Sequence, residues 1–218
     1  ATVGDGKHFF FKHYRPVNAI LTVAGHVNTP RVRELAEKWF GDIPPGEQYI
    51  RHLPQEPLQA GARKLEVRSG VPVDAFYKCW HICSRMDRRY YATDLITEIL
   101  GGGGSSRLFQ SLVKEKQLFS SIGCYHFGSI DAGLLAIEGK LAQGVKMEDA
   151  DAAVEAELRK ITDSPVEEKE LRKVKNKTES LIAFEDMSLV NRAGSLFFYT
   201  LLGDTHMINE ELEKYQTV

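Results

Sequence analysis

The sequence predicts an α+β fold, with a mostly antiparallel sheet and helices packed on one face. Two pairs of strand-like segments carry this prediction: 63–68 with 73–83, and 119–129 with 133–141. The second pair is joined by only three residues, which favours a hairpin. Helical patterns fall between the pairs and after them. From residue 63 the expected order is therefore two strands, two helices, two strands and three helices.

The composition is that of an ordinary globular chain of 218 residues. Hydrophobic residues make up 43%, charged residues 27%, and the formal net charge is −2. No basic excess points to nucleic acid, and the apolar runs are too short to cross a bilayer, so neither partner is expected. Three cysteines, Cys79, Cys83 and Cys124, are too few and wrongly spaced for a disulfide framework or a zinc ribbon.

Residues 1–50 are predicted to form the tail of a preceding domain. A helix end at 8–14, a buried strand at 18–27 and a helix at 29–40 follow one another, and nothing nearby offers this strand a partner. Because an unpaired strand edge can pair with another copy, a homodimer is possible. Residues 42–61 then hold four of the eight prolines and indicate a linker.

Residues 61–218 are expected to form a second domain, cut short at its C-terminal end. Its longest predicted helix covers 164–202, with Ser164 as N-cap and Pro165 at the first helical position. Arg192 and Tyr199 lie seven residues apart in it, so both should point from one face. We single out this pair as candidate site residues; the alternative is a surface arginine and a tyrosine packed among aromatics. The other predicted helices are 88–100, one from Ser105 or Ser106 to 116, 145–161 and 208–215.

A run of four glycines, Gly101, Gly102, Gly103 and Gly104, separates two of these helices. A phosphate-binding P-loop requires a lysine before its Ser or Thr, which is missing here. The run is therefore interpreted as a flexible connection, with contact to a substrate or partner as the open alternative.

The seven histidines form no metal-binding motif. Neither His-x-x-Glu-His nor His-Glu-x-x-His occurs, and His8 and His13 are five residues apart, which does not give the shared helical face that zinc sites favour. This chain is therefore expected to bind no metal itself.

Three segments in register carry a family resemblance. They are 10–27 (FFKHYRPVNAILTVAGHV), 35–44 (LAEKWFGDIP) and 100–109 (LGGGGSSRLF), and Asp131-Ala132-Gly133 adds a turn between two strands. The segments resemble those of the M16 metallopeptidases, the family of insulin-degrading enzyme, pitrilysin and the mitochondrial processing peptidase. The chain departs from the family pattern after 109, where Val113, Gln117 and Ser120 stand in place of Arg, Gly and Tyr.

The resemblance implies a LuxS/MPP-like metallohydrolase lobe at 61–218, preceded by the end of a first lobe at 1–50. In this family two halves close like a clamshell around a peptide. Zinc is held by one half, outside this chain. The opposite half supplies an Arg and a Tyr, seven apart on a helix, that hold the substrate; Arg192 and Tyr199 match this pair.

The expected function is therefore the substrate-holding, non-metal-binding part of a zinc-dependent endopeptidase. Its partners would be a peptide substrate and a zinc-bearing half, in the same polypeptide or in another subunit. The alternative is a non-catalytic structural or partner subunit of an M16-type assembly. The sequence upstream of residue 1 would distinguish the two, because an intact zinc motif favours the enzyme. The residues alone do not identify the compartment; the family resemblance implies a soluble protein of the bacterial cytoplasm or periplasm.

Overall fold

The computed structural model describes all residues except 49, 51–53 and 55, and the chain divides into two compact units. Unit 1 comprises Ala1–Arg68 and Glu185–Ile208, and unit 2 comprises Ser69–Phe184 and Asn209–Val218. The sequence instead grouped residues 185–208 with the C-terminal domain. The assignment of 1–50 and 61–218 to two successive lobes therefore stays a prediction.

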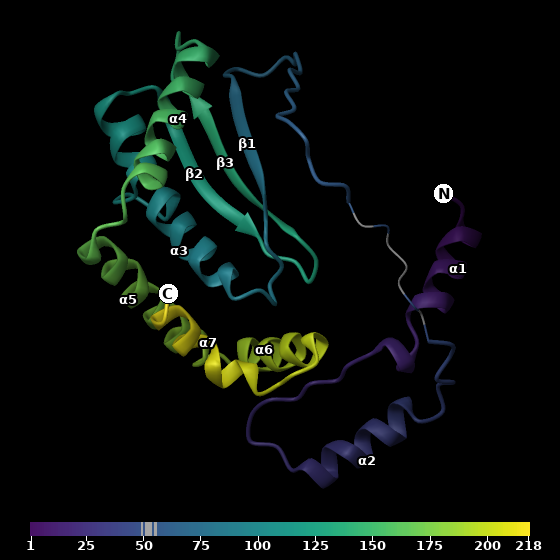
Figure 1. Ribbon diagram of the computed structural model, residues 1–218. Helices are drawn as coiled ribbons and strands as arrows, with labels where there is room; N and C mark the ends of the chain where they lie inside the picture. Colours follow the sequence, from purple (N-terminus) through teal and green to yellow (C-terminus); the bar gives the residue numbers. More distant parts are fainter. Residues whose placement is uncertain (49, 51–53, 55) are drawn as a thin grey trace. The chain divides into compact units, whose positions relative to one another are not determined.

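Unit 2 is built around a three-stranded antiparallel sheet with the order β1-β3-β2 (Figure 1). The strands are β1 (Ala75–Ile82), β2 (Phe119–Phe127) and β3 (Gly133–Leu141), as the alternating segments predict. β3 lies in the centre and pairs with both neighbours, so that Glu138 stands opposite Tyr77 on β1 and Gly123 on β2. The hairpin between β2 and β3 is confirmed.

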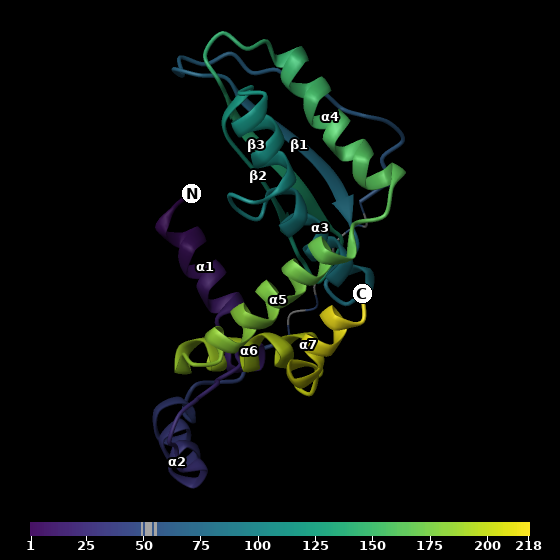
Figure 2. The same cartoon turned by 90° about the vertical axis from the view of Figure 1, so that its left-hand side faces the viewer.

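Helices cover one face of this sheet, which confirms the predicted fold class (Figure 2). They are α3 (Arg89–Gly101), the π-helix η2 (Phe109–Glu115) and α4 (Met147–Asp163). Each contributes to one buried cluster with all three strands, because alternate strand residues point to the same side. Its members are Phe76, Leu100, Leu108, Leu112, Phe119, Ile122, Cys124, Ile137, Leu141, Ala150 and Val154.

A second cluster joins α3 to α5 (Glu168–Glu185) and α7 (Met207–Gln216). Its buried members are Tyr90, Tyr91, Leu95, Ile99, Val174 and Tyr215. The Tyr215 hydroxyl donates to the Asp94 carboxylate at 2.5 Å, which ties α7 to α3. The buried guanidinium of Arg85 pairs with Glu211 on α7 and lies over the rings of both α3 tyrosines.

Unit 1 contains α1 (Val3–His13), the short 3₁₀ helix η1 (Pro16–Asn18), α2 (Thr29–Phe40) and α6 (Leu189–Leu202). The helix predicted at 29–40 is confirmed, with Asn28 as its N-cap. The strand predicted at 18–27 is wrong: residues 19–24 have no regular secondary structure. A strand needs a neighbour to accept its backbone hydrogen bonds, and none of the described residues of unit 1 forms one.

Two further predictions need correction. Residues 63–68 form no strand, and Leu65 and Val67 are 86% and 75% exposed. Alternation of apolar residues was therefore not sufficient for pairing with another strand. The single helix predicted at 164–202 is two helices, α5 and α6. The break at 186–188 ends with Ser188, whose hydroxyl accepts a hydrogen bond from the Asn191 backbone and caps α6. None of the described helices is long and apolar enough to cross a membrane.

Candidate functional site

Helix α6 carries both residues that the sequence singled out, Arg192 and Tyr199. The helix begins after the Ser188 cap and ends at Gly203, which has a φ of 94° and closes it in the left-handed conformation. Arg192 stands in the first turn of the helix and its side chain is exposed. Its Nε donates to the backbone carbonyl of Asp186 at 2.5 Å, in the turn between α5 and α6. The guanidinium is thus anchored by one nitrogen at the start of the helix.

Tyr199, two turns further along α6, is only 2% exposed. Its ring packs edge-on against Phe198, with the centroids 5.7 Å apart. The sequence placed both side chains on one face; the structure adds that the arginine is open to solvent while the tyrosine is enclosed. This burial is what the alternative interpretation of a packed aromatic expects, so a substrate-holding role for Tyr199 stays a prediction.

The glycines between α3 and η2 have structural reasons of their own. A Cβ added to Gly101 would lie 1.9 Å from the backbone nitrogen of Cys124, because the end of α3 packs directly against β2. A Cβ on Gly102 would lie 2.2 Å from a carboxylate oxygen of Glu98. Gly103 has a φ of +101°, which side chains rarely allow. Close packing therefore accounts for Gly101 and Gly102, and backbone conformation accounts for Gly103.

The same loop is tied to its surroundings by side chains. Ser106 donates its hydroxyl to the Gly103 carbonyl at 2.7 Å, and Gln110 donates to the Gly104 carbonyl. From α5, Lys173 donates to the Ser105 hydroxyl at 2.7 Å, and Lys177 donates to the Gly102 carbonyl at 3.2 Å. Contact between Gly101–Gly104 and a substrate or partner stays a prediction. A ligand that binds there would meet a loop that is already hydrogen-bonded to side chains of its own chain.

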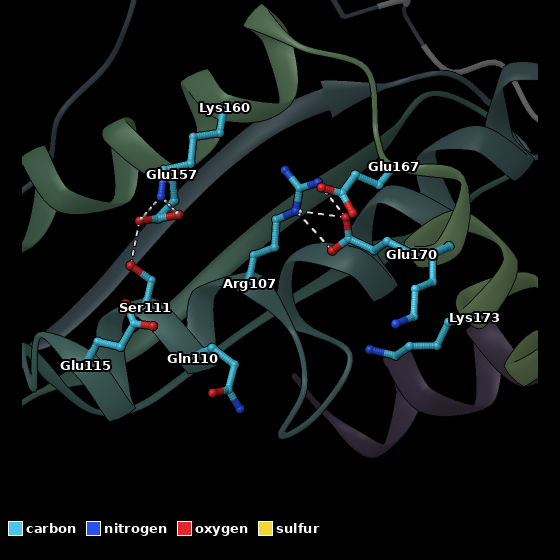
Figure 3. A pocket seen from close by; sticks show the side chains of 10 residues that line it. Arg107, Gln110, Ser111, Glu115, Glu157, Lys160, Glu167, Glu170 and Lys173 are labelled. Atoms are coloured by element: carbon cyan, nitrogen blue, oxygen red, sulfur yellow. Dashed lines mark hydrogen bonds and ion pairs between the residues drawn. The ribbon is translucent and has the colours of Figure 1, made fainter.

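A polar pocket of about 680 Å³ lies beside this loop on the helical side of unit 2 (Figure 3). Arg107, from the SSRLF segment, reaches across it to α5 and pairs with the Glu170 carboxylate through Nε and Nη2, at 3.0 and 2.5 Å. Four cations and four carboxylates line it together with Gln110 and Ser111, so the charges balance. The remaining members are Glu115, Glu157, Lys160, Glu167, Lys169 and Lys173.

Glu157 is the buried member of this pocket, with 2% of its surface exposed. Burial raises the pKa of its carboxyl group, but hydrogen bonds from Lys160, Ser111 and Lys116 outweigh burial and lower the pKa below its usual value. The group is therefore an ionised, fully paired carboxylate. Sequence reasoning missed it, because Ser111 and Glu157 are 46 residues apart and no local pattern connects them.

The described residues do not provide a zinc site. Among them, no three His, Cys, Asp or Glu side chains come close enough together to hold a metal ion. His126 shows how one such side chain is used instead: its Nε2 lies 2.6 Å from the Tyr90 hydroxyl and its Nδ1 lies 3.4 Å from the Asp94 carboxylate. His126 is thus engaged in pairing within unit 2, and we assign no metal-dependent step to it.

Comparison with known proteins gives a consistent result. Residues 1–178 match the family model described as "Peptidase M16 inactive domain". The zinc protease PqqE of Helicobacter pylori is 29% identical over 177 residues, which is 80% of this chain and 40% of that protein. An uncharacterized zinc protease of Bacillus subtilis, YmxG, is 28% identical over 144 residues, 62% of this chain and 32% of that protein.

Solved structures agree with the observed fold. The crystal structure of a protease from Helicobacter pylori matches all of this chain and 53% of its own, with a TM-score of 0.90 and 25% identity. A peptidase M16 inactive domain from Pseudomonas fluorescens matches all of this chain and 52% of its own, with a TM-score of 0.79 and 19% identity. The chain therefore spans about half the length, or less, of these four proteins.

Proposed function

This chain belongs to the peptidase M16 family as an inactive domain, and on that premise we propose that it is the substrate-holding part of a zinc-dependent endopeptidase. In this proposal the chain binds no metal. It forms one wall of a chamber, and a zinc-bearing half, in the same polypeptide or in a partner subunit, forms the other. The substrate is a peptide that lies between the two halves.

The observation that carries the proposal is the match of residues 1–178 to an M16 inactive domain. The relatives that share this region are zinc proteases, and this chain covers only 40% of the length of PqqE. Among the described residues, no three potential ligands lie close enough together to hold a metal ion. In our proposal the zinc therefore belongs to the other half, and this chain holds the substrate.

We assign the holding role to α6, which lies beyond the matched residues. Arg192 presents a planar guanidinium with several donors, suited to the carbonyls of an extended peptide or to charge that develops on the scissile carbonyl. Its Nε is anchored on the Asp186 carbonyl, which limits the orientations of the exposed group. Tyr199 would add a phenol donor two turns away, after a rearrangement that uncovers its buried hydroxyl.

The test uses the full-length protein together with its zinc-bearing half. Arg192→Ala and Tyr199→Phe should each lower kcat/KM on peptide substrates about a hundred- to a thousandfold, as loss of one transition-state donor does. Zinc content and melting temperature should stay near those of the wild type. Tyr199→Phe is the cleaner change because it keeps the ring. Arg172→Ala, at an exposed arginine on α5, is the matched control and should be silent.

The outcomes separate the proposal from its alternatives. If Arg192→Ala and Tyr199→Phe both show wild-type kinetics, the holding role is wrong. If Tyr199→Phe alone is silent and Tyr199→Ala lowers stability by several kcal/mol, Tyr199 is a packing residue. If the zinc-bearing half lacks an intact His-x-x-Glu-His motif and the complete assembly hydrolyses no peptide, the chain is a structural subunit.

A further inference from the structure

The segment that fails to form a strand, residues 19–24, lies along the first turns of α6. Thr22 donates its hydroxyl to the backbone carbonyl of Ala193 at 3.0 Å. Burial alternates along the segment, with Ile20, Thr22 and Ala24 half-buried while Leu21 and Val23 are exposed. Next to it, the Leu189 side chain lies 3.5 Å from the Cβ position of Gly25. The segment thus contacts α6 at Ala193, and Gly25, which follows it, lies near Leu189, one turn earlier in the helix.

We propose that Thr22 is a positioning residue for Arg192. The inference rests on the proposed function, because it concerns the helix that would hold the substrate. Ala193 follows Arg192 directly, so a bond that fixes the Ala193 carbonyl also fixes the backbone from which the guanidinium projects. The two residues joined by this bond are 171 positions apart in the chain.

The neighbouring sequence explains why this turn of α6 needs an external contact. Gly194 comes next, and glycine is a poor helix former because its backbone loses the most freedom on folding. Apart from its chain neighbours and the backbone of its own helix, no described atom lies within 4 Å of the Cβ position of Gly194, so side-chain packing does not hold this residue. Three interactions therefore fix the start of the helix: the Ser188 cap, the bond from Arg192 to Asp186, and Thr22.

Precise placement matters for a residue that contacts a reacting peptide. A displacement of about 1 Å can reduce a rate roughly a hundredfold. Loss of the Thr22 hydroxyl leaves the Ser188 cap and the Asp186 contact in place. The expected loss of rate is therefore smaller than a hundredfold. Without this hydroxyl, we expect the Arg192 guanidinium to be present but less precisely oriented toward the substrate.

The experiment compares Thr22→Val, which keeps the shape but removes the donor, with Thr22→Ser, which keeps the donor. In the full-length enzyme with its zinc-bearing half, Thr22→Val should lower kcat/KM about three- to tenfold, the range expected for one neutral hydrogen bond. Thr22→Ser should stay within about twofold of the wild type. Thr200→Val is the matched control: it removes a hydroxyl whose bond to the Leu196 carbonyl lies within α6.

Two readouts distinguish positioning from a general effect on stability. If Thr22 acts through Arg192, Thr22→Val combined with Arg192→Ala should be no slower than Arg192→Ala alone. Amide hydrogen exchange in the first two turns of α6 should be faster in Thr22→Val than in Thr22→Ser.

Each result bears on one of the two proposals. Full additivity of the two changes, or unchanged exchange together with wild-type kinetics in Thr22→Val, overturns the positioning role and leaves the holding role of Arg192 intact. A silent Arg192→Ala overturns the holding role, and with it the positioning of that residue. Faster exchange in Thr22→Val would in that case still show that the hydroxyl holds the helix.

Discussion

Units 1 and 2 both contain regular α-helices, but they bury very different numbers of apolar side chains. In unit 2, α3, η2, α4 and the sheet share one buried cluster, and α3, α5 and α7 share another. In unit 1, neither α1 nor α2 contains a buried residue. Phe10 on α1 and Trp39 on α2 are 52% and 67% exposed. Tyr199 is the one buried hydrophobic residue described in unit 1.

This difference separates two requirements of folding. Capping residues and helical periodicity are sufficient to define α1 and α2, whose N-caps Thr2 and Asn28 both accept backbone hydrogen bonds. A core also requires elements that face each other, and unit 1 offers few among its described residues. The exposed apolar faces agree with the prediction that residues 1–50 form the tail of a preceding lobe.

The largest expected effect is in amide hydrogen exchange of this chain as a dilute monomer. Amides at 19–24 should exchange at least about a thousandfold faster than those at 134–140, because the first segment lacks a ladder and the central strand β3 is paired on both sides. Mass spectrometry of peptides from the two segments measures this ratio. Equal protection in the monomer would contradict the comparison, because 18–27 would then be protected without a partner copy.

A second prediction compares two glycines, one from each unit. Gly101→Ala should lower the free energy of unfolding by at least about 3 kcal/mol, because its Cβ would meet the backbone of β2. Gly194→Ala, in an open position on α6, should stabilise the helix by about 0.5–1 kcal/mol. Urea denaturation followed by circular dichroism compares them. A Gly101→Ala protein as stable as the wild type would show that α3 can move away from β2.

The smallest expected effect is the pH dependence of unit 2 that arises from Glu157. Its pKa in the folded chain is lowered, so the unfolded chain binds the proton first as the pH falls. Its contribution to stability is therefore complete above the usual glutamate pKa of 4.5 and is lost as the pH falls through the lowered value. We expect this contribution to be about 1–3 kcal/mol.

Glu157→Gln provides the control for this pH effect. The variant should be less stable at neutral pH, and the difference from the wild type should shrink on acidification. Thermal unfolding between pH 7 and pH 3 measures it. A constant difference across this range would mean that the paired charge is not the source of the effect.

Most of unit 2 was predictable, because its elements follow local patterns. The alternation in β2 and β3, the three-residue connection between them and the helical periodicity of α3 and α4 are all visible in neighbouring residues. The predicted N-cap at Ser164 is wrong, because this residue is the C-cap of α4 and α5 begins at Glu168. The break at 186–188 was missed because apolar spacing continues through it, although Ser188 is a capping residue. The failed strand at 18–27 was missed because strand formation depends on partners that local patterns do not reveal.

The sequence identified the residues of the candidate site, but it did not predict how exposed each side chain is. A spacing of seven places Arg192 and Tyr199 on one helical face, but it carries no information about depth, and the structure exposes one and buries the other. The contact between Thr22 and Ala193 and the paired carboxylate of Glu157 both join distant parts of the chain. Such long-range pairs leave no local signal in a single sequence.

The glycine-rich loop has a consequence for how relatives are recognised. Gly101 and Gly103 are explained by close packing and backbone conformation, and Arg107 by its ion pair with Glu170, all of which serve folding. A folded lobe needs such residues whether or not the protein that carries them cleaves peptides. In this chain the LGGGGSSRLF segment is therefore explained by architecture. A search that finds it identifies the scaffold, and whether a given protein still cleaves peptides has to be decided from residues elsewhere.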